Sequence, residues 1–147
     1  MFDDLNDLYQ QVIMDHSRSP RNFRAMTNAN RAGQGRNPLC GDQVEIFVRL
    51  ENDQIQDISF QGSGCAISKA SASMMTDSLK GKSKAEAEKI FQEFRDMVTA
   101  GVPHEDLDKL SVFAGVNKFP ARVKCAILPW HAASAALNGQ DTAVSTE

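Results

Sequence analysis

Cysteine is scarce in this chain of 147 residues, which has only three, and no two of them form a C-x-x-C pair. An odd number of cysteines cannot be fully paired within one chain, and this small number excludes a disulfide-rich secreted scaffold. Free thiols fit a reducing compartment, so we predict a cytoplasmic protein. The three thiols then act either as small buried hydrophobic groups or as a functional cluster.

Long apolar runs and an excess of positive charge are also missing. No stretch approaches the roughly 20 apolar residues of a membrane helix, and the N-terminus lacks the basic and then apolar order of a signal peptide. The 16 Lys and Arg residues are outnumbered by 19 Asp and Glu residues, which gives a formal net charge of -3. We therefore expect neither a membrane nor a nucleic acid as a partner.

The composition that remains is that of a globular domain, with 41% hydrophobic and 24% charged residues. The length suits one hydrophobic core. We predict a single domain over residues 1–137 and a flexible C-terminal tail over residues 138–147, because the last ten residues are mostly small or polar.

The hydrophobic pattern predicts a helix over residues 3–17 and a long loop over residues 19–39. Alternation over residues 44–50 and 55–60, with turn residues between them, predicts an antiparallel hairpin. Helices are predicted over residues 65–79 and 119–137, and a further helix is predicted to begin at a capping box that starts at Ser83. One short turn is predicted over residues 104–110.

Each cysteine lies in a local sequence that favours an accessible thiolate. In Cys40-Gly41-Asp42, a conformationally free glycine and a carboxylate follow the thiol. In Gly62-Ser63-Gly64-Cys65, the thiol lies at a predicted helix N-terminus, where unpaired N–H groups and the helix dipole lower the pKa of a cysteine from about 8.5. Cys125 follows two cations, Arg122 and Lys124.

Zinc would give such cysteines a reason to converge, because Cys, His and Asp side chains bind it in tetrahedral sites. Three thiolates need a fourth ligand, and Asp42 is the best candidate because it lies beside Cys40, whereas no histidine lies in a comparable motif. Two alternatives stay open on these grounds. The cysteines could be core residues with Asp42 capping a turn, or the zinc could be purely structural.

Four motifs, in order along the chain, resemble those of the IscU/NifU-like iron-sulfur assembly family. They are Cys40-Gly41-Asp42, Gly62-Ser63-Gly64-Cys65-Ala66-Ile67-Ser68, Ala70-Ser71-Ala72-Ser73-Met74-Met75 and Phe119-Pro120-Ala121-Arg122-Val123-Lys124-Cys125. The resemblance runs from the first helix to about Leu137 and is most specific to the SufU-like branch. Lys124 stands where scaffold-type members have a histidine, their Leu-Pro-Pro-Val-Lys motif is absent, and the 60 positions from Cys65 to Cys125 accommodate the SufU-like insertion.

The resemblance implies a small α+β fold, with a three-stranded antiparallel sheet packed against helices. It implies a zinc ion bound by Cys40, Asp42, Cys65 and Cys125. It also implies two partners, a SufS-type cysteine desulfurase and the downstream iron-sulfur assembly machinery. In SufU-like proteins the cysteine at the position of Cys40 accepts persulfide sulfur after a desulfurase histidine displaces it from zinc, so the implied activity is zinc-dependent sulfur transfer.

A second function, of a different class, uses the same residues. The protein could be a scaffold that binds iron or an iron-sulfur cluster through its cysteines. Lys124 in place of histidine favours sulfur transfer. Arg122 and Lys124 are expected either to tune the charge of the site, to contact a partner, or to lie on a solvated helix face.

Overall fold

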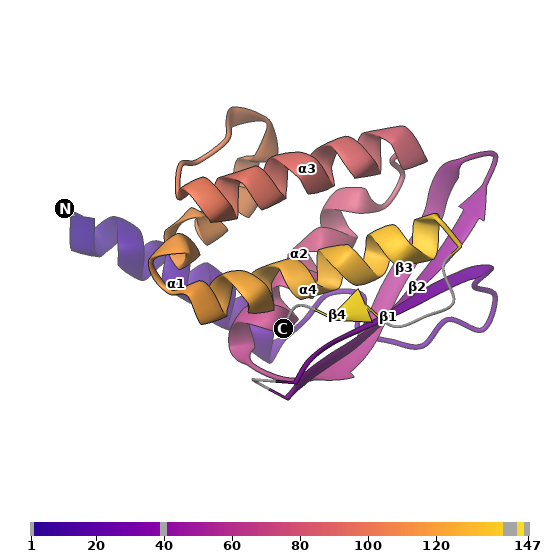
Figure 1. Cartoon of the computed structure of the whole chain (residues 1–147), viewed down its shortest axis with the longest axis horizontal. Coiled ribbons are helices and arrows are strands. Elements are labelled where there is room, and N and C mark those ends of the chain that lie inside the picture. The colour runs from indigo at the N-terminus through magenta and orange to yellow at the C-terminus, as the bar shows by residue number, and fades with distance from the viewer. Residues whose placement is uncertain (1, 39–40, 140–143, 146–147) are drawn as a thin grey trace.

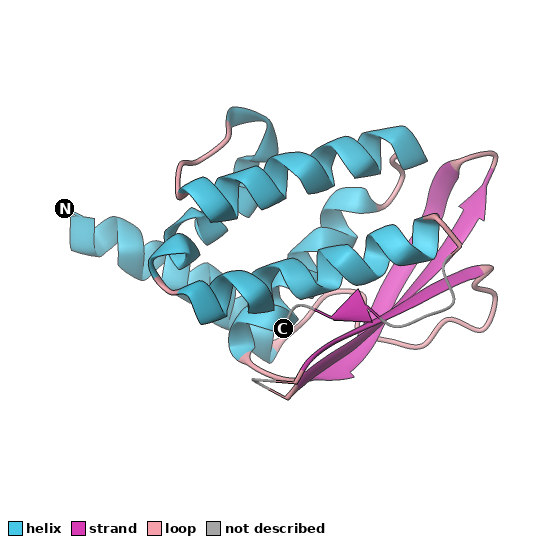
Figure 2. Ribbon diagram, in the orientation of Figure 1, coloured by secondary structure: helices cyan, strands magenta, loops and turns pink. Residues whose placement is uncertain are grey.

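The computed structural model describes residues 2–38, 41–139 and 144–145, with four α-helices, a 3-10 helix η1 and four strands within them. The elements follow one another as α1 (Phe2–Arg18), β1 (Arg31–Asn37), β2 (Asp42–Glu51), β3 (Gln54–Ser63), α2 (Ala66–Leu79), α3 (Lys84–Ala100), η1 (Glu105–Lys118), α4 (Pro120–Leu137) and β4 (Val144–Ser145). Helices α2 and α4 pack on the sheet, and α3 lies beyond α4 (Figures 1 and 2). None of the described helices is long and apolar enough to cross a membrane.

The sheet has the order β3-β2-β1-β4, with β2 antiparallel to both of its neighbours. This confirms the expected α+β fold with three antiparallel strands packed against helices. The two-residue strand β4 is an addition to that fold and pairs parallel with β1 opposite Gly35 and Arg36. The domain limits and the flexibility of residues 138–147 stay predictions.

The hairpin of β2 and β3 forms as the alternating pattern predicts. Val44, Ile46 and Val48 are buried on the face toward the helices, and the residues between them are more exposed. Asn52 and Asp53 form the turn with φ values of 52° and 59°, in the left-handed region that Asn and Asp tolerate better than most residues. The hairpin therefore has both of the local features that specify it, an apolar face and a suitable turn.

Strand β1 corrects the prediction of a loop over residues 19–39. Its buried positions are Gly33, Gly35 and Asn37, so no apolar alternation marks it as a strand. Helix α4 comes so close to β1 that a Cβ at Gly33 would overlap the backbone oxygen of Ala132. Glycine is thus used where a side chain would normally fill the space between helix and sheet.

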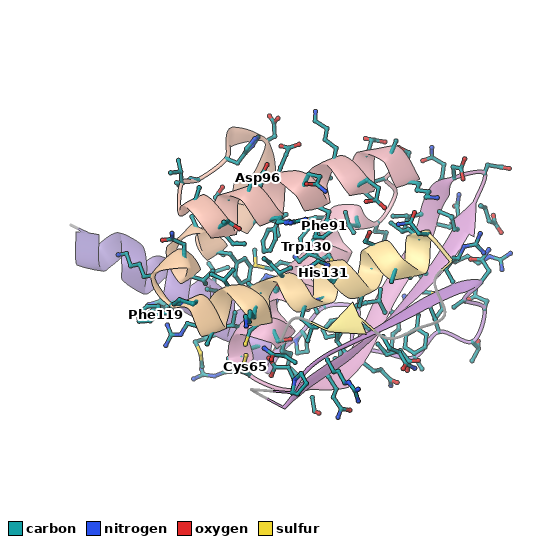
Figure 3. The ribbon with its side chains drawn as sticks, in the orientation of Figure 1. Cys65, Phe91, Asp96, Phe119, Trp130 and His131 are labelled. Atoms are coloured by element: carbon teal, nitrogen blue, oxygen red, sulfur yellow. The ribbon has the colours of Figure 1, made fainter. Side chains whose placement is uncertain are left out.

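The helices follow the remaining predictions, with one extension. Ser83 and Glu86 form both hydrogen bonds of the capping box at the start of α3. The single turn expected over residues 104–110 is instead the longer helix η1, which packs against α3. The ring of Trp130 on α4, which Figure 3 labels, stacks on that of Phe94 on α3. Their centroids lie 4.5 Å apart, and the pair joins the two helices in the core.

Candidate metal centre

Three of the four predicted ligands meet where β2, α2 and α4 begin. Asp42 is the first residue of β2, Cys65 immediately precedes α2, and Cys125 lies in the second turn of α4. One potential ligand atom from each of the three lies within 4.8 Å of the others. Cys40, the fourth predicted ligand and the predicted sulfur acceptor, lies outside the described residues.

Cys65 caps helix α2 rather than lying in its first turn. Its backbone is extended, with φ -73° and ψ 164°, and its Sγ accepts a hydrogen bond from the Ser68 N–H at 3.4 Å. A sulfur in this position lies at the positive end of the helix dipole, where a thiolate is stabilised. The glycines that end β3 therefore place a nucleophilic side chain, as well as changing the chain direction.

Asp42 is completely buried, and its carboxylate is directed at the cysteines. Oδ1 accepts a hydrogen bond from the Cys65 N–H at 2.8 Å, and Oδ2 lies 3.5 Å from the Cys65 Sγ. No lysine or arginine among the described residues forms an ion pair with this carboxylate. A buried carboxylate beside two thiols is a donor set that suits zinc.

The glycine before Cys65 allows this close approach. Gly64 has φ 153°, and a Cβ at this position would overlap Asp42 Oδ1. Because only glycine leaves room for the carboxylate here, Gly64 is a site residue even though it has no ligand atom. The local sequence around Gly64 predicted a helix N-terminus but gave no connection between this glycine and Asp42.

The two thiols of the metal-free centre differ sharply in acidity. A hydrogen bond from the Cys125 thiol lowers the pKa of Cys65 to about 7, assisted by the Ser68 N–H against the opposing effect of burial. The same hydrogen bond and burial raise the pKa of Cys125, a residue that is only 3% exposed. The pair therefore holds one proton on Cys125 while Cys65 becomes the thiolate.

This asymmetry predicts the alkylation profile of the zinc-free protein. In a Cys40→Ser background, the rate of Cys65 alkylation should rise with pH and reach half its maximum near pH 7, because the thiolate reacts and the thiol does not. Cys125→Ala removes the hydrogen-bond donor and should move the midpoint upward. Peptide mass spectrometry measures both profiles, and a midpoint near the ordinary value of about 8.5 in both proteins would contradict the prediction.

Arg122 and Lys124 lie in the first turns of α4, close in sequence to Cys125. The Arg122 guanidinium lies 4.4 Å from the centre of the Phe119 ring. Phe119, which Figure 3 labels at the start of α4, is 49% exposed. Lys124 is half-buried. The exposed pair of an aromatic ring and a cation is a feature that sequence reasoning missed, although Phe119 belongs to the motif before Cys125. A role for either cation in tuning the site stays a prediction.

The fold and its centre define a class of small α+β domains in which an aspartate and cysteines converge at one end of an antiparallel sheet. The sequence matches the family described as NifU-like N terminal domain over residues 8–126. The chain therefore belongs to this family, and the resemblance drawn from its motifs is confirmed.

Named relatives include both functional types. The chain is 44% identical over 131 residues to the zinc-dependent sulfurtransferase SufU of Bacillus subtilis, covering 87% of this chain and 88% of that protein. It is 42% identical over 135 residues to the iron-sulfur cluster assembly scaffold protein IscU of Streptococcus pyogenes, covering 90% and 84%. A crystal structure of a candidate scaffold protein for the SUF system from Fervidobacterium islandicum superposes with a TM-score of 0.82 at 34% identity, covering 86% and 94%.

Proposed function

We propose that this protein is a zinc-dependent sulfurtransferase, which accepts persulfide sulfur from a SufS-type cysteine desulfurase for iron-sulfur cluster assembly. The observation that carries the proposal is the convergence of Asp42, Cys65 and Cys125, with a fully buried carboxylate and potential ligand atoms within 4.8 Å. Similarity to the zinc-dependent sulfurtransferase SufU supports the same activity.

The proposed ligand set is completed by Cys40. Its position two residues before Asp42 supports this assignment, because two residues of chain span at most about 7 Å. When bound, zinc keeps cysteine ligands deprotonated at neutral pH. Asp42 supports the site in a second way, because its hydrogen bond from the Cys65 N–H holds the start of α2 against β2.

The proposed transfer is a thiolate attack on the terminal sulfur of an enzyme-bound persulfide. A sulfur-sulfur bond forms to Cys40 and the sulfur-sulfur bond of the donor breaks, so that the donor cysteine leaves as a thiolate. The reaction exchanges one persulfide for another and needs neither oxidant nor reductant. Transfer requires a deprotonated nucleophile that the donor can reach, and the partial exposure of Cys65 at the start of α2 suits a donor carried by another protein.

The proposed setting follows from this chemistry. The desulfurase is the donor, and the downstream iron-sulfur assembly machinery receives the sulfur. Free cysteines and the need for reduced sulfur support a cytoplasmic location.

Intact-protein mass spectrometry tests the transfer. The zinc-loaded chain is mixed anaerobically with a SufS-type desulfurase and cysteine, and peptide mapping should locate one added sulfur on Cys40. Cys40→Ser should prevent that addition and abolish the stimulation of cysteine turnover, while it keeps the size of the side chain. Undiminished stimulation by this variant, or sulfur found only on Cys65 or Cys125, would rule out Cys40 as the acceptor.

A scaffold function is the second candidate, because the relative from Streptococcus pyogenes is named a cluster assembly scaffold. Cysteines and an aspartate can also ligate iron or a cluster. The same anaerobic mixture distinguishes the two functions when iron is added. Stable iron and sulfide on the chain, without a persulfide on Cys40, would favour the scaffold.

A further inference from the structure

A second group of metal-ligating side chains lies between α3 and η1, on elements that supply none of the described ligands of the cysteine centre. It consists of Glu93 from α3, His104 at the N-cap of η1 and Asp106 in the first turn of η1. One potential ligand atom from each lies within 4.8 Å of the others. Nitrogen and carboxylate oxygen together form a donor set that suits first-row divalent transition metals such as zinc.

The Glu93 carboxylate supplies an independent reason to look for a cation here. Its Oε2 is buried and has no hydrogen-bond donor among the described residues. The whole side chain is 13% exposed, so water reaches little of it. A buried carboxylate oxygen without a donor is costly and rare in folded proteins, which means that a positive group at this point would stabilise it.

The His104 nitrogen that faces Glu93 Oε2 is itself positioned as an acceptor. His104 Nδ1 lies 3.1 Å from Oε2, and the Asp106 N–H donates a hydrogen bond to the same Nδ1 at 3.2 Å. While its lone pair accepts that bond, Nδ1 has no proton to give to Glu93. Two acceptors at this separation repel each other unless a cation lies between them.

The spacing agrees with two ligands on one metal ion. Zinc bonds to imidazole nitrogen and carboxylate oxygen are about 2.0–2.2 Å long, which places neighbouring ligand atoms about 2.8–3.6 Å apart at octahedral to tetrahedral angles. The observed 3.1 Å lies within this range. On binding, the ion would replace the Asp106 N–H as the partner of Nδ1, and because Asp106 is exposed, water can take over that N–H.

We propose that Glu93, His104 and Asp106 form a second binding site for a divalent transition-metal ion, which ties helix η1 to helix α3. The site has one nitrogen and two carboxylate ligands, with its remaining positions open to water. It contains no thiolate, so it binds zinc more weakly than the cysteine centre. The site is independent of the proposed sulfur transfer, because its ligands come from α3 and η1.

Calorimetric titration of the full chain with Zn2+, after one equivalent has filled the cysteine centre, tests this site. A second equivalent should bind at least about tenfold more weakly than the first, and it should shift the imidazole nitrogen resonances of His104 but not those of His16 or His131. Glu93→Gln and His104→Asn should each weaken the second equivalent at least tenfold. Asp96→Asn, an exposed acid on the same helix, is the matched control and should change it less than twofold (Figure 3).

Two further measurements keep the result interpretable. Circular dichroism and retention of the first equivalent show that each variant is folded. Loss of that first equivalent through Cys65→Ser should leave the second site intact, so failure at one centre is separable from failure at the other. Absence of a second equivalent up to millimolar Zn2+, or undiminished binding by either Glu93→Gln or His104→Asn, would overturn the proposal.

Discussion

Asp42→Ala is expected to lower zinc affinity by at least about 100-fold and leave the purified chain with much less than one zinc. The carboxylate is fully buried, and it is the one carboxylate in the described part of the centre, so the substitution removes a charged ligand beside both described cysteines. The variant should also destabilise the zinc-free protein by about 1–3 kcal/mol, because the Cys65 N–H loses its acceptor. Metal analysis and chemical denaturation measure the two effects.

Asp42→Asn separates those two roles. The amide oxygen can still accept the Cys65 N–H, so the zinc-free protein should keep most of its stability. Zinc affinity should nevertheless fall, because a neutral amide is a poorer zinc ligand than a carboxylate. Wild-type zinc affinity in both variants would remove Asp42 from the proposed ligand set and leave it with the hydrogen bond alone.

Gly64→Ala should disable the centre without altering any ligand. The added Cβ would overlap Asp42 Oδ1 and lie 2.9 Å from its Cγ, so the carboxylate must move away from the cysteines or the start of α2 must shift. We expect zinc affinity to fall at least about tenfold, which corresponds to about 1.4 kcal/mol. Competition with a chromogenic chelator measures this change.

Gly81→Ala is the matched control for the backbone. Gly81 has φ 84°, and a Cβ there would have no neighbour within 4 Å. Both substitutions place alanine at a positive φ that L-residues rarely adopt, at a cost of about 1–3 kcal/mol, but only the one at Gly64 reaches the site. Equal loss of zinc in the two variants would show that general destabilisation, and not displacement of Asp42, is responsible.

Local sequence was sufficient where an element carries its own signal. The β2–β3 hairpin has apolar alternation and a turn at Asn52 and Asp53, and α3 has a capping box at Ser83 and Glu86. Strand β1 carries no such signal, because its inward positions are glycines and an asparagine. Its identity depends on pairing with β2 and on the close approach of α4, which are contacts with distant parts of the chain.

For the candidate centre, too, the local sequence was sufficient for some features and not for others. The residue types around each cysteine, and the position of Asp42 beside Cys40, were enough to name the donor set and the metal it suits. They could not show that Gly64 makes room for Asp42, or that Cys125 donates to Cys65 and so lowers its pKa. Those effects arise from atoms a few ångströms apart on segments that are 22 and 60 residues apart in sequence.

By itself, then, the sequence determined the chemistry that this chain can offer, since ligand type, local turns and helix caps are properties of neighbouring residues. Only the tertiary structure decided how Asp42, Cys65 and Cys125 share one small buried space, and which of the two thiols gives up its proton. It alone brought Glu93 next to His104 as well. The physical reason is that burial and short-range contact set the energy of a charge, and both depend on packing between segments that the order of residues does not place together.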